Sequence, residues 1–306
     1  MSKEPEHLRS SPRPVSVAAV QMACEWDRDA NLARAERLVR AAAARGAQII
    51  LLPELFETPY FCIEQDARHL ALARSADASP AVRHFSALAR ELGVVLPISF
   101  FERAGPAYFN SIAILDADGS NLGIYRKSHI PNGPGYQEKN YFSPGDTGFR
   151  VWQTRFARIG VGICWDQWFP ETARVMALQG AELFFFPTAI GSEPPPALPV
   201  ESREHWQRTQ QGHAAANLTP LIAANRYGLE RSVQNPQGLY IRFYGSSFIA
   251  DATGAKVAEA PAEGEAILTH GFDLTAIAQL RDNWFVFRDR RPDLYGPLVS
   301  LDGRRP

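Results

Sequence analysis

The sequence repeats itself in outline, with two matches at almost the same separation along the chain. Gly46-Ala-Gln-Ile-Ile-Leu-Leu-Pro53 resembles Gly180-Ala-Glu-Leu-Phe-Phe-Phe-Pro187 at an offset of 134 residues. Ile114-Leu-Asp-Ala-Asp-Gly119 resembles Ile249-Ala-Asp-Ala-Thr-Gly254 at an offset of 135 residues. Because both matches set the halves in one register, they favour a chain of two similar halves over chance similarity between common helix–strand junctions.

The matches indicate what each half contains. The first has the pattern of a helix end, a buried strand and a proline, and the second that of a hairpin turn. A looser match between Leu92–Phe100 and Leu218–Arg226 is typical of a helix end running into a strand. We therefore expect each half to form one sheet with helices on its outer face. Two such sheets packed face to face give an α/β fold, a four-layer α-β-β-α sandwich with an internal pseudo-two-fold repeat.

Apolar runs and helical spacing predict the individual elements. Strands are expected over 15–22, 48–54, 94–101, 159–165 and 183–187, with a hairpin pairing 111–115 and 122–127. Helices are expected over 31–45, about 80–92 and 170–179. The loop over 128–147 is rich in glycine and proline, and loops of this length are usually functional or disordered.

Composition narrows the class of partner. The chain has 306 residues, 45% of them hydrophobic, and a formal net charge of −1. We expect no nucleic acid partner because phosphate binding needs clustered Lys and Arg, and no membrane because no run of about 18 apolar residues is present. Residues 1–14 are polar and are interpreted as a flexible N-terminal arm without a secretory leader, and 15–306 as a single domain. The expected partner is a small molecule or another copy of the chain.

The three cysteines are too few and too scattered for a disulfide framework. No CxxC or HExxH motif is present, so we expect no metal and no cofactor. This cysteine usage favours a reducing compartment and hence a cytoplasmic protein.

Three reactive side chains stand where buried strands are expected to end: Glu54, Lys127 and Cys164. Taken singly, each has a simpler interpretation, since a lone Cys in an apolar strand is usually an inert core residue and the other two are usually solvated. The combination is more informative. A thiol nucleophile needs a base, and the tetrahedral intermediate that it forms needs a positive donor.

In their local settings, LLPELF, YRKSHIP and GVGICWDQWFPE, these residues resemble the nitrilase superfamily of carbon–nitrogen hydrolases. The resemblance covers residues from about 15 to 295. It implies the α-β-β-α sandwich, homo-oligomers and a cofactor-free Glu-Lys-Cys site with a further glutamate in the long loop, which Glu138 matches. The sequence departs from the pattern at Asn132, where the resemblance implies an acidic residue.

The resemblance implies attack by Cys164 on a ureido or amide carbon. Glu54 is expected to take the thiol proton, and Lys127 with the backbone N–H of Trp165 is expected to stabilise the oxyanion. Lys127 and the helix beginning at Pro170 are expected to lower the pKa of the thiol. Glu54 or Glu138 then protonates departing ammonia.

A ureido substrate with a distal ammonium needs a carboxylate near that ammonium. Asp166 and Glu193 are the candidates, and we favour Glu193 because it lies in a proline-rich loop. Its alternative is a solvated loop carboxylate. Tyr60 and Trp165, with Phe61, are expected to supply apolar walls, while His129 either lines the site or only satisfies a loop hydrogen bond.

Two other functions fit the same residues. A ureido acid hydrolase could share every catalytic residue, but it would need an Arg for the substrate carboxylate, and none stands beside Glu193. An inactive fold used as a binding module is disfavoured by the intact reactive residues. The small residues in 211–217 are interpreted as helix packing, with a subunit contact as the alternative.

Overall fold

Residues 11–192 and 202–304 are described in the computed structural model, and they divide into two units. The larger unit spans 14–272. The smaller combines 11–13 with the chain from 273 onwards.

The first half of the larger unit contains two α-helices and five strands. β1 pairs in parallel with β2, placing Val17 opposite Ile49, while β3, β4 and β5 form an antiparallel meander. A parallel bridge between Ile49 and Val95 joins the two groups of strands. The bounds are β1 (Pro14–Gln21), α1 (Arg28–Ala44), β2 (Ile49–Leu51), α2 (Pro80–Leu92), β3 (Leu96–Ala104), β4 (Ala107–Leu115) and β5 (Asn121–Arg126).

The second half forms a six-stranded sheet in the order β13-β12-β9-β8-β7-β6. Its centre is parallel, with β8 between β7 and β9. A separate antiparallel ribbon joins β10 to β11, and β14 lies beside β1 in the first sheet. The bounds are β6 (Val151–Gln153), β7 (Arg158–Val161), α3 (Pro170–Leu178), β8 (Leu183–Thr188), α4 (Ser202–Asn217), β9 (Leu221–Asn225), β10 (Tyr227–Arg231), β11 (Tyr240–Tyr244), β12 (Phe248–Ala250), β13 (Lys256–Glu259) and β14 (Ala266–Asp273).

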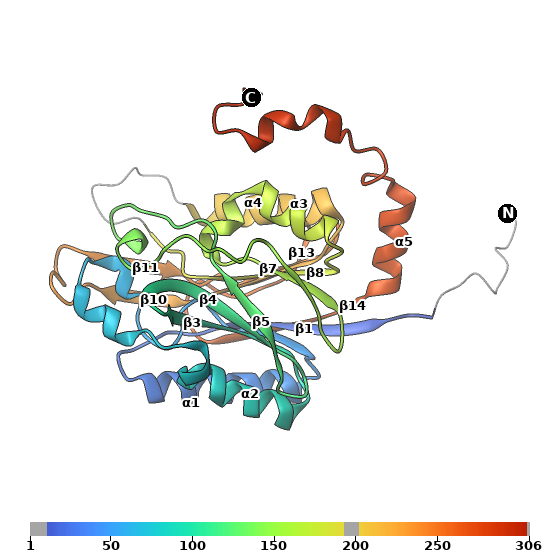
Figure 1. The fold of residues 1–306 in the computed structure, drawn as a ribbon. Helices are drawn as coiled ribbons and strands as arrows, with labels where there is room; N and C mark the ends of the chain where they lie inside the picture. The colour runs from blue at the N-terminus through green and yellow to red at the C-terminus, as the bar shows by residue number, and fades with distance from the viewer. Residues whose placement is uncertain (1–10, 193–201, 305–306) are drawn as a thin grey trace, which may run out of the picture. The chain divides into compact units, whose positions relative to one another are not determined.

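The larger unit has four layers (Figure 1). Helices α1 and α2 lie on one side, helices α3 and α4 on the other, and the two sheets lie between them. The apolar stripes of α1 and α2 face the first sheet, where Leu38 and Phe85 pack with Ile50 in one buried cluster. The four-layer sandwich expected from the sequence is therefore confirmed.

The repeated hairpin turns confirm the internal repeat at atomic detail. The N–H of Asp116 donates to Ser120 O at 2.8 Å, and that of Asp251 donates to Ala255 O at 2.9 Å. Gly119 and Gly254 close the turns with φ of 82° and 85°. A Cβ on either glycine would lie 2.5 Å from a backbone oxygen, in α2 for Gly119 and in α4 for Gly254. Each half thus packs its turn against the corresponding helix.

Element boundaries show where local pattern is sufficient. The predicted helix over 80–92 is α2 itself, with Ser79 as N-cap and Gly93 as a left-handed C-cap. The strand predicted over 159–165 stops at Val161, and the backbone turns at Cys164, which has positive φ and begins a 3-10 helix. The strand predicted over 48–54 is also shorter, since β2 covers three residues.

The smaller unit is built on α5 (Leu274–Trp284). Asp273 caps this helix by accepting from the Thr275 N–H at 2.9 Å, and it also accepts from the Arg13 N–H at 3.0 Å. From the last residue of the helix onwards, several large apolar side chains are exposed: Trp284, Phe285, Leu294, Tyr295, Leu298, Val299 and Leu301.

Candidate active site

Glu54 leaves the first sheet on a tight turn. Leu55, directly after it, has φ of 48°, which is uncommon for a residue with a Cβ. The Leu55 N–H donates to Ser99 Oγ at 2.9 Å. Asn110 of β4 donates its Nδ2–H to Glu54 Oε1 at 2.7 Å. One oxygen of the buried carboxylate is therefore fixed, while Oε2 has no partner among the described residues.

Lys127 joins two carboxylates. Its Nζ lies 2.9 Å from Glu54 Oε1, and 2.8 and 2.7 Å from the two oxygens of Glu138. All three side chains are completely buried. Burial disfavours the charged lysine, but Glu138 and Glu54 together raise its pKa well above the ordinary value. The ammonium is therefore stable at neutral pH, with two carboxylates around one cation.

Glu138 lies in a short 3-10 helix, η5 (Glu138–Asn140), within the long loop. The Tyr60 hydroxyl donates to its Oε1 at 2.6 Å. Burial raises the pKa of Glu138 to about 7, opposed by Lys127 and reinforced by Glu54. This carboxyl consequently changes charge near neutral pH.

Cys164 begins the 3-10 helix η6 (Cys164–Trp168) and has φ of 42°. Gly162 allows the approach to this turn, because a Cβ there would lie 2.6 Å from a ring atom of Phe186. The thiol Sγ lies 3.9 Å from the carbonyl oxygen of Ala189. The nucleophile candidate therefore stands on a strained backbone turn that follows the end of β7.

The pKa of the Cys164 thiol is raised well above its ordinary value, first by burial and then by Glu54. Lys127 lowers it only in part. Lys127 acts in the expected direction, but burial and Glu54 outweigh it, so the net pKa of the thiol is raised and not lowered as expected. The thiol is buried, and η6 separates Cys164 from the start of α3.

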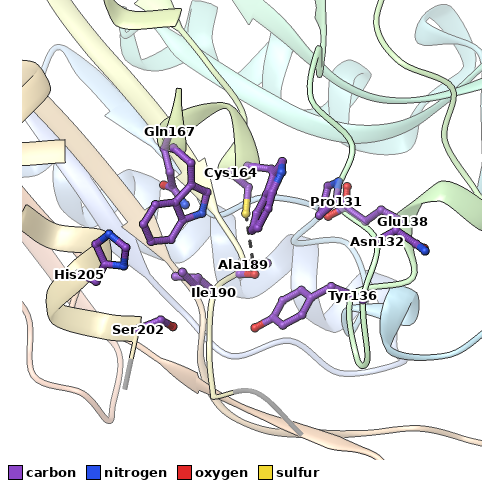
Figure 2. Close-up of a pocket in the computed structure, with 13 residues that line it drawn as sticks. Pro131, Asn132, Tyr136, Glu138, Cys164, Gln167, Ala189, Ile190, Ser202 and His205 are labelled. Carbon is purple, nitrogen blue, oxygen red and sulfur yellow. Dashed lines mark hydrogen bonds between the residues drawn. The ribbon is translucent and has the colours of Figure 1, made fainter. Parts of the chain in front are cut away.

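A cavity of about 360 Å³ opens over the thiol. Figure 2 shows Cys164 and Glu138 within its wall. The lining residues are Pro131, Asn132, Gly133, Tyr136, Glu138, Cys164, Trp165, Gln167, Trp168, Ala189, Ile190, Ser202 and His205. Most of this surface is apolar or aromatic, which is typical of a small-molecule site.

Gln167 has a fixed amide orientation in this wall. Its Oε1 accepts from Trp206 Nε1 at 2.9 Å and from Gln210 Nε2 at 3.1 Å. An indole N–H can only donate, so the oxygen assignment is determined. Gln167 Nε2 is buried and has no partner within 11–192 and 202–304.

Asp166, a candidate for binding the substrate ammonium, and His129, expected either to line the site or to make a loop hydrogen bond, bind each other and do not line the cavity. Asp166 Oδ1 lies 2.8 Å from His129 Nδ1, and Oδ2 accepts from the Tyr125 hydroxyl at 2.7 Å and the Ile163 N–H at 3.0 Å. His129 stacks on Phe169 with centroids 3.7 Å apart. These contacts favour a role in holding the Lys127 strand end against the Cys164 turn.

The other predicted contacts divide into two groups. Trp165 lines the cavity and is 39% exposed. Tyr60 and Phe61 are buried in a neighbouring apolar cluster, where Tyr60 reaches the site through Glu138. Glu193 lies outside the described residues.

Sequence reasoning missed several groups that shape the site. Asn110 binds Glu54, while Trp168 and His205 form one aromatic wall with centroids 4.8 Å apart. Arg226 is fully buried and contacts the turn after Glu54. The available signal was a polar residue inside an apolar strand, as Asn110 is in Ala107–Leu115.

One group of side chains could offer ligand atoms to a metal ion. Glu64, Asp66 and His69 bring their ligand atoms within 4.8 Å of one another. Glu64 already accepts from the Gln234 N–H at 2.9 Å, and Asp66 binds Arg68. None of the three lines the cavity over Cys164.

The described ranges contain no helix that is both long enough and apolar enough to cross a membrane.

Comparisons with known proteins agree with this geometry. The sequence pattern of the carbon–nitrogen hydrolase family matches residues 16–282. The chain is 58% identical to an N-carbamoylputrescine amidase of Arabidopsis thaliana, covering 95% of this chain and 97% of that protein. It is 53% identical to a citrullinase of Francisella tularensis, covering 93% of this chain and 98% of the relative.

Solved structures give the same assignment. A carbon–nitrogen hydrolase from Helicobacter pylori superposes with a TM-score of 0.88 at 38% identity, covering 94% of this chain and 99% of that one. A nitrilase-superfamily member from Saccharomyces cerevisiae superposes with a TM-score of 0.75 at 27% identity, covering 91% of this chain and 97% of that one. The sequence match, the four-layer fold and the joined Glu54, Lys127, Glu138 and Cys164 site lead to one conclusion: the chain belongs to the carbon–nitrogen hydrolase family of the nitrilase superfamily.

Proposed function

We propose that the chain hydrolyses N-carbamoylputrescine to putrescine, carbon dioxide and ammonia, as an amidohydrolase acting on linear C–N bonds. The observation that carries the substrate is the 58% identity to an N-carbamoylputrescine amidase over nearly the whole chain. The reaction class is supported by Cys164 and Glu138, which line one cavity, and by Lys127, which joins Glu138 to Glu54.

The first chemical step is attack of Cys164 Sγ on the ureido carbon. The resting thiol is protonated because burial raises its pKa. Glu54, whose Oε2 has no protein partner among the described residues, takes the thiol proton as the C–S bond forms. Lys127 and the backbone N–H of Trp165 stabilise the oxyanion. A charged lysine in a site without water is effective in this role.

The tetrahedral intermediate then collapses by breaking a C–N bond, and the departing nitrogen group receives a proton from Glu54 or Glu138. Glu138 suits this exchange because its pKa of about 7 lets it hold or release a proton at neutral pH. Water activated by Glu54 cleaves the thioester. The overall balance is one water consumed for one amine, one ammonia and one carbon dioxide formed.

The cavity supports a flexible chain ending in an ammonium. Trp165, Trp168 and Tyr136 line the cavity, and aromatic rings attract cations. Glu193 is proposed as the carboxylate that pairs with the ammonium, on the sequence argument alone. Asp166 is a weaker candidate because its oxygens are already bound within the protein.

A second candidate function is hydrolysis of citrulline, favoured by the 53% identity to the Francisella citrullinase. Citrulline and N-carbamoylputrescine differ by one carboxylate on the carbon that carries the ammonium. The carboxylate of citrulline would need hydrogen-bond donors in the cavity. Gln167 Nε2 is one such donor, because it is buried in the cavity wall and has no protein partner among the described residues.

One assay separates the two. Purified protein is incubated with N-carbamoylputrescine, citrulline or neutral N-carbamoylbutylamine, and both ammonia and the amine product are measured. We expect the highest kcat/KM with N-carbamoylputrescine. A higher value with citrulline would reassign the substrate, and no ammonia from any ureido compound would refute the function.

We also propose a homo-oligomer in a cytoplasmic, reducing setting. The exposed apolar side chains between Trp284 and Leu301 support contacts with further copies. The three cysteines are free, which suits a reducing compartment. Sedimentation velocity of the full chain tests the assembly, and a single monomer peak at micromolar concentration would contradict it.

A further inference from the structure

A buried arginine from the second half of the chain holds the turn that carries Glu54. Arg226 follows β9 and is completely buried. Its Nη2 donates to the carbonyl oxygens of Glu54 at 2.7 Å and Leu55 at 3.0 Å. Its Nη1 donates to Thr58 O at 3.2 Å. One guanidinium therefore gathers three carbonyls of a segment about 170 residues away along the chain.

Glu230 completes this arrangement from β10. Its Oε1 lies 2.9 Å from Arg226 Nη1, and its Oε2 accepts from the Tyr60 N–H. Burial raises the pKa of Glu230 while Arg226 opposes the shift. The pair thus reaches both ends of the segment 54–60: the arginine binds Glu54 and Leu55, and the glutamate binds Tyr60.

The segment needs such support because its backbone is strained. Leu55 has φ of 48°, a conformation that L side chains rarely adopt. A short displacement here would move the Glu54 carboxylate relative to the thiol. It would also move the Tyr60 hydroxyl, which donates to Glu138.

We propose that Arg226, paired with Glu230, is a positioning residue for hydrolysis. It fixes segment 54–60 and so aims the Glu54 carboxylate and the Tyr60 hydroxyl at Lys127 and Glu138. Neither Arg226 nor Glu230 lines the cavity. This inference rests on the proposed function in that Glu54 is taken as the base.

The test separates positioning from simple charge burial. Arg226→Met leaves Glu230 buried and unpaired, which destabilises a protein strongly. The double variant Arg226→Met/Glu230→Gln removes both charges, and its new amide oxygen can still accept from the Tyr60 N–H. We expect the double variant to regain most of the Tm lost in the single variant, with kcat still about 100-fold below wild type and KM within about threefold. Recovery of kcat together with Tm would overturn the proposal.

A second measurement is independent of substrate identity. Alkylation of Cys164 by iodoacetamide at pH 7 reports transfer of the thiol proton, and we expect it to be about tenfold slower in the double variant. Arg40→Met is the control, since Arg40 of α1 pairs with Glu91 at 2.6 Å and neither residue lines the cavity. That control should alkylate at the wild-type rate.

The two failures are distinguishable. If wild type hydrolyses no ureido compound, the proposed function fails, while the alkylation rates still test whether Arg226 positions the base. Equal alkylation in the wild type and the folded double variant would refute the positioning role whatever the substrate is.

Discussion

At the scale of single residues, the candidate nucleophile is a neutral thiol, because the pKa of Cys164 is raised. Lys127 lowers the pKa of the Cys164 thiol, but burial and Glu54 outweigh it, so the net shift is upward. Burial then keeps the proton on sulfur until a base removes it during attack. Such a nucleophile is protected from chance oxidation, because reactive cysteines are those with lowered pKa and good exposure.

Cys164→Ala should abolish ammonia release while leaving the fold intact, because only the sulfur is removed. The thermal midpoint from circular dichroism is expected within a few degrees of wild type. Cys24→Ala and Cys62→Ala are the matched controls and should keep most activity, although buried Cys62 leaves a small void. Undiminished turnover in the folded Cys164 variant would contradict the assignment of the nucleophile.

Glu138 should set the acid limb of the pH profile. Its pKa is about 7, so the carboxyl is protonated below that pH and cannot accept fully from Lys127 and Tyr60. We expect kcat/KM to rise with pH through about 7. Glu138→Gln should be much slower and should lack this limb. A limb that persists unchanged in the variant would assign it to another group.

Glu193→Gln isolates the charge proposed to bind the substrate ammonium. Losing one partner of a buried pair costs about 2–5 kcal/mol, so kcat/KM for N-carbamoylputrescine should fall roughly thirtyfold to several-thousandfold. Neutral N-carbamoylbutylamine should lose much less. Glu204→Gln, an exposed carboxylate on α4 paired with Arg208, is the control. Equal losses with both substrates would make Glu193 structural or catalytic.

At the scale of elements, local pattern predicts helices better than the ends of catalytic strands. The limits of α2 follow from Ser79, Pro80 and Gly93, all adjacent signals. The ends before Glu54 and Cys164 do not, because Leu55 and Cys164 itself adopt positive φ under tertiary contacts. Leucine and cysteine readily adopt extended backbone, so the sequence gives no sign that tertiary contacts hold these two residues at positive φ.

The paired hairpin turns give a stability prediction. Gly119→Ala or Gly254→Ala places a Cβ against a backbone oxygen at positive φ, so each should lower the free energy of unfolding by about 1–3 kcal/mol. Gly212→Ala in α4 is the control. No heavy atom lies within 4 Å of the new Cβ, and the change should stabilise by roughly 0.5–1 kcal/mol. Urea unfolding measures both, and equal effects would contradict the packing argument.

At the scale of the whole molecule, the fold could be predicted because the same helix–strand and hairpin patterns occur in both halves of the sequence. The positions of Glu54, Lys127, Glu138 and Cys164 relative to one another followed only from family resemblance. The contacts of Asn110 and Arg226 could not be predicted. They join segments 56 and 172 residues apart, and no local periodicity marks such pairs.

Activity should not depend on a bound metal. Dialysis against a strong chelator is expected to leave kcat unchanged, since the candidate groups around Cys164 are a thiol, a lysine and two carboxylates joined by it. The cluster of Glu64, Asp66 and His69 makes the assay informative. Activity that falls on dialysis and returns with a divalent ion would refute the prediction, and Asp66→Asn would then locate the ion.

The two halves contribute unequal parts to the chemistry. Glu54, Lys127 and Glu138 come from the half that ends with the long loop, whereas the sulfur comes from the half that begins with β6. The two halves therefore share an architecture but have different chemical roles. One half supplies the groups that bind and transfer protons, and the other supplies the sulfur nucleophile. Two polypeptides made by cutting after the long loop, just before β6, should each be inert, and ammonia should be released only after they have reassociated.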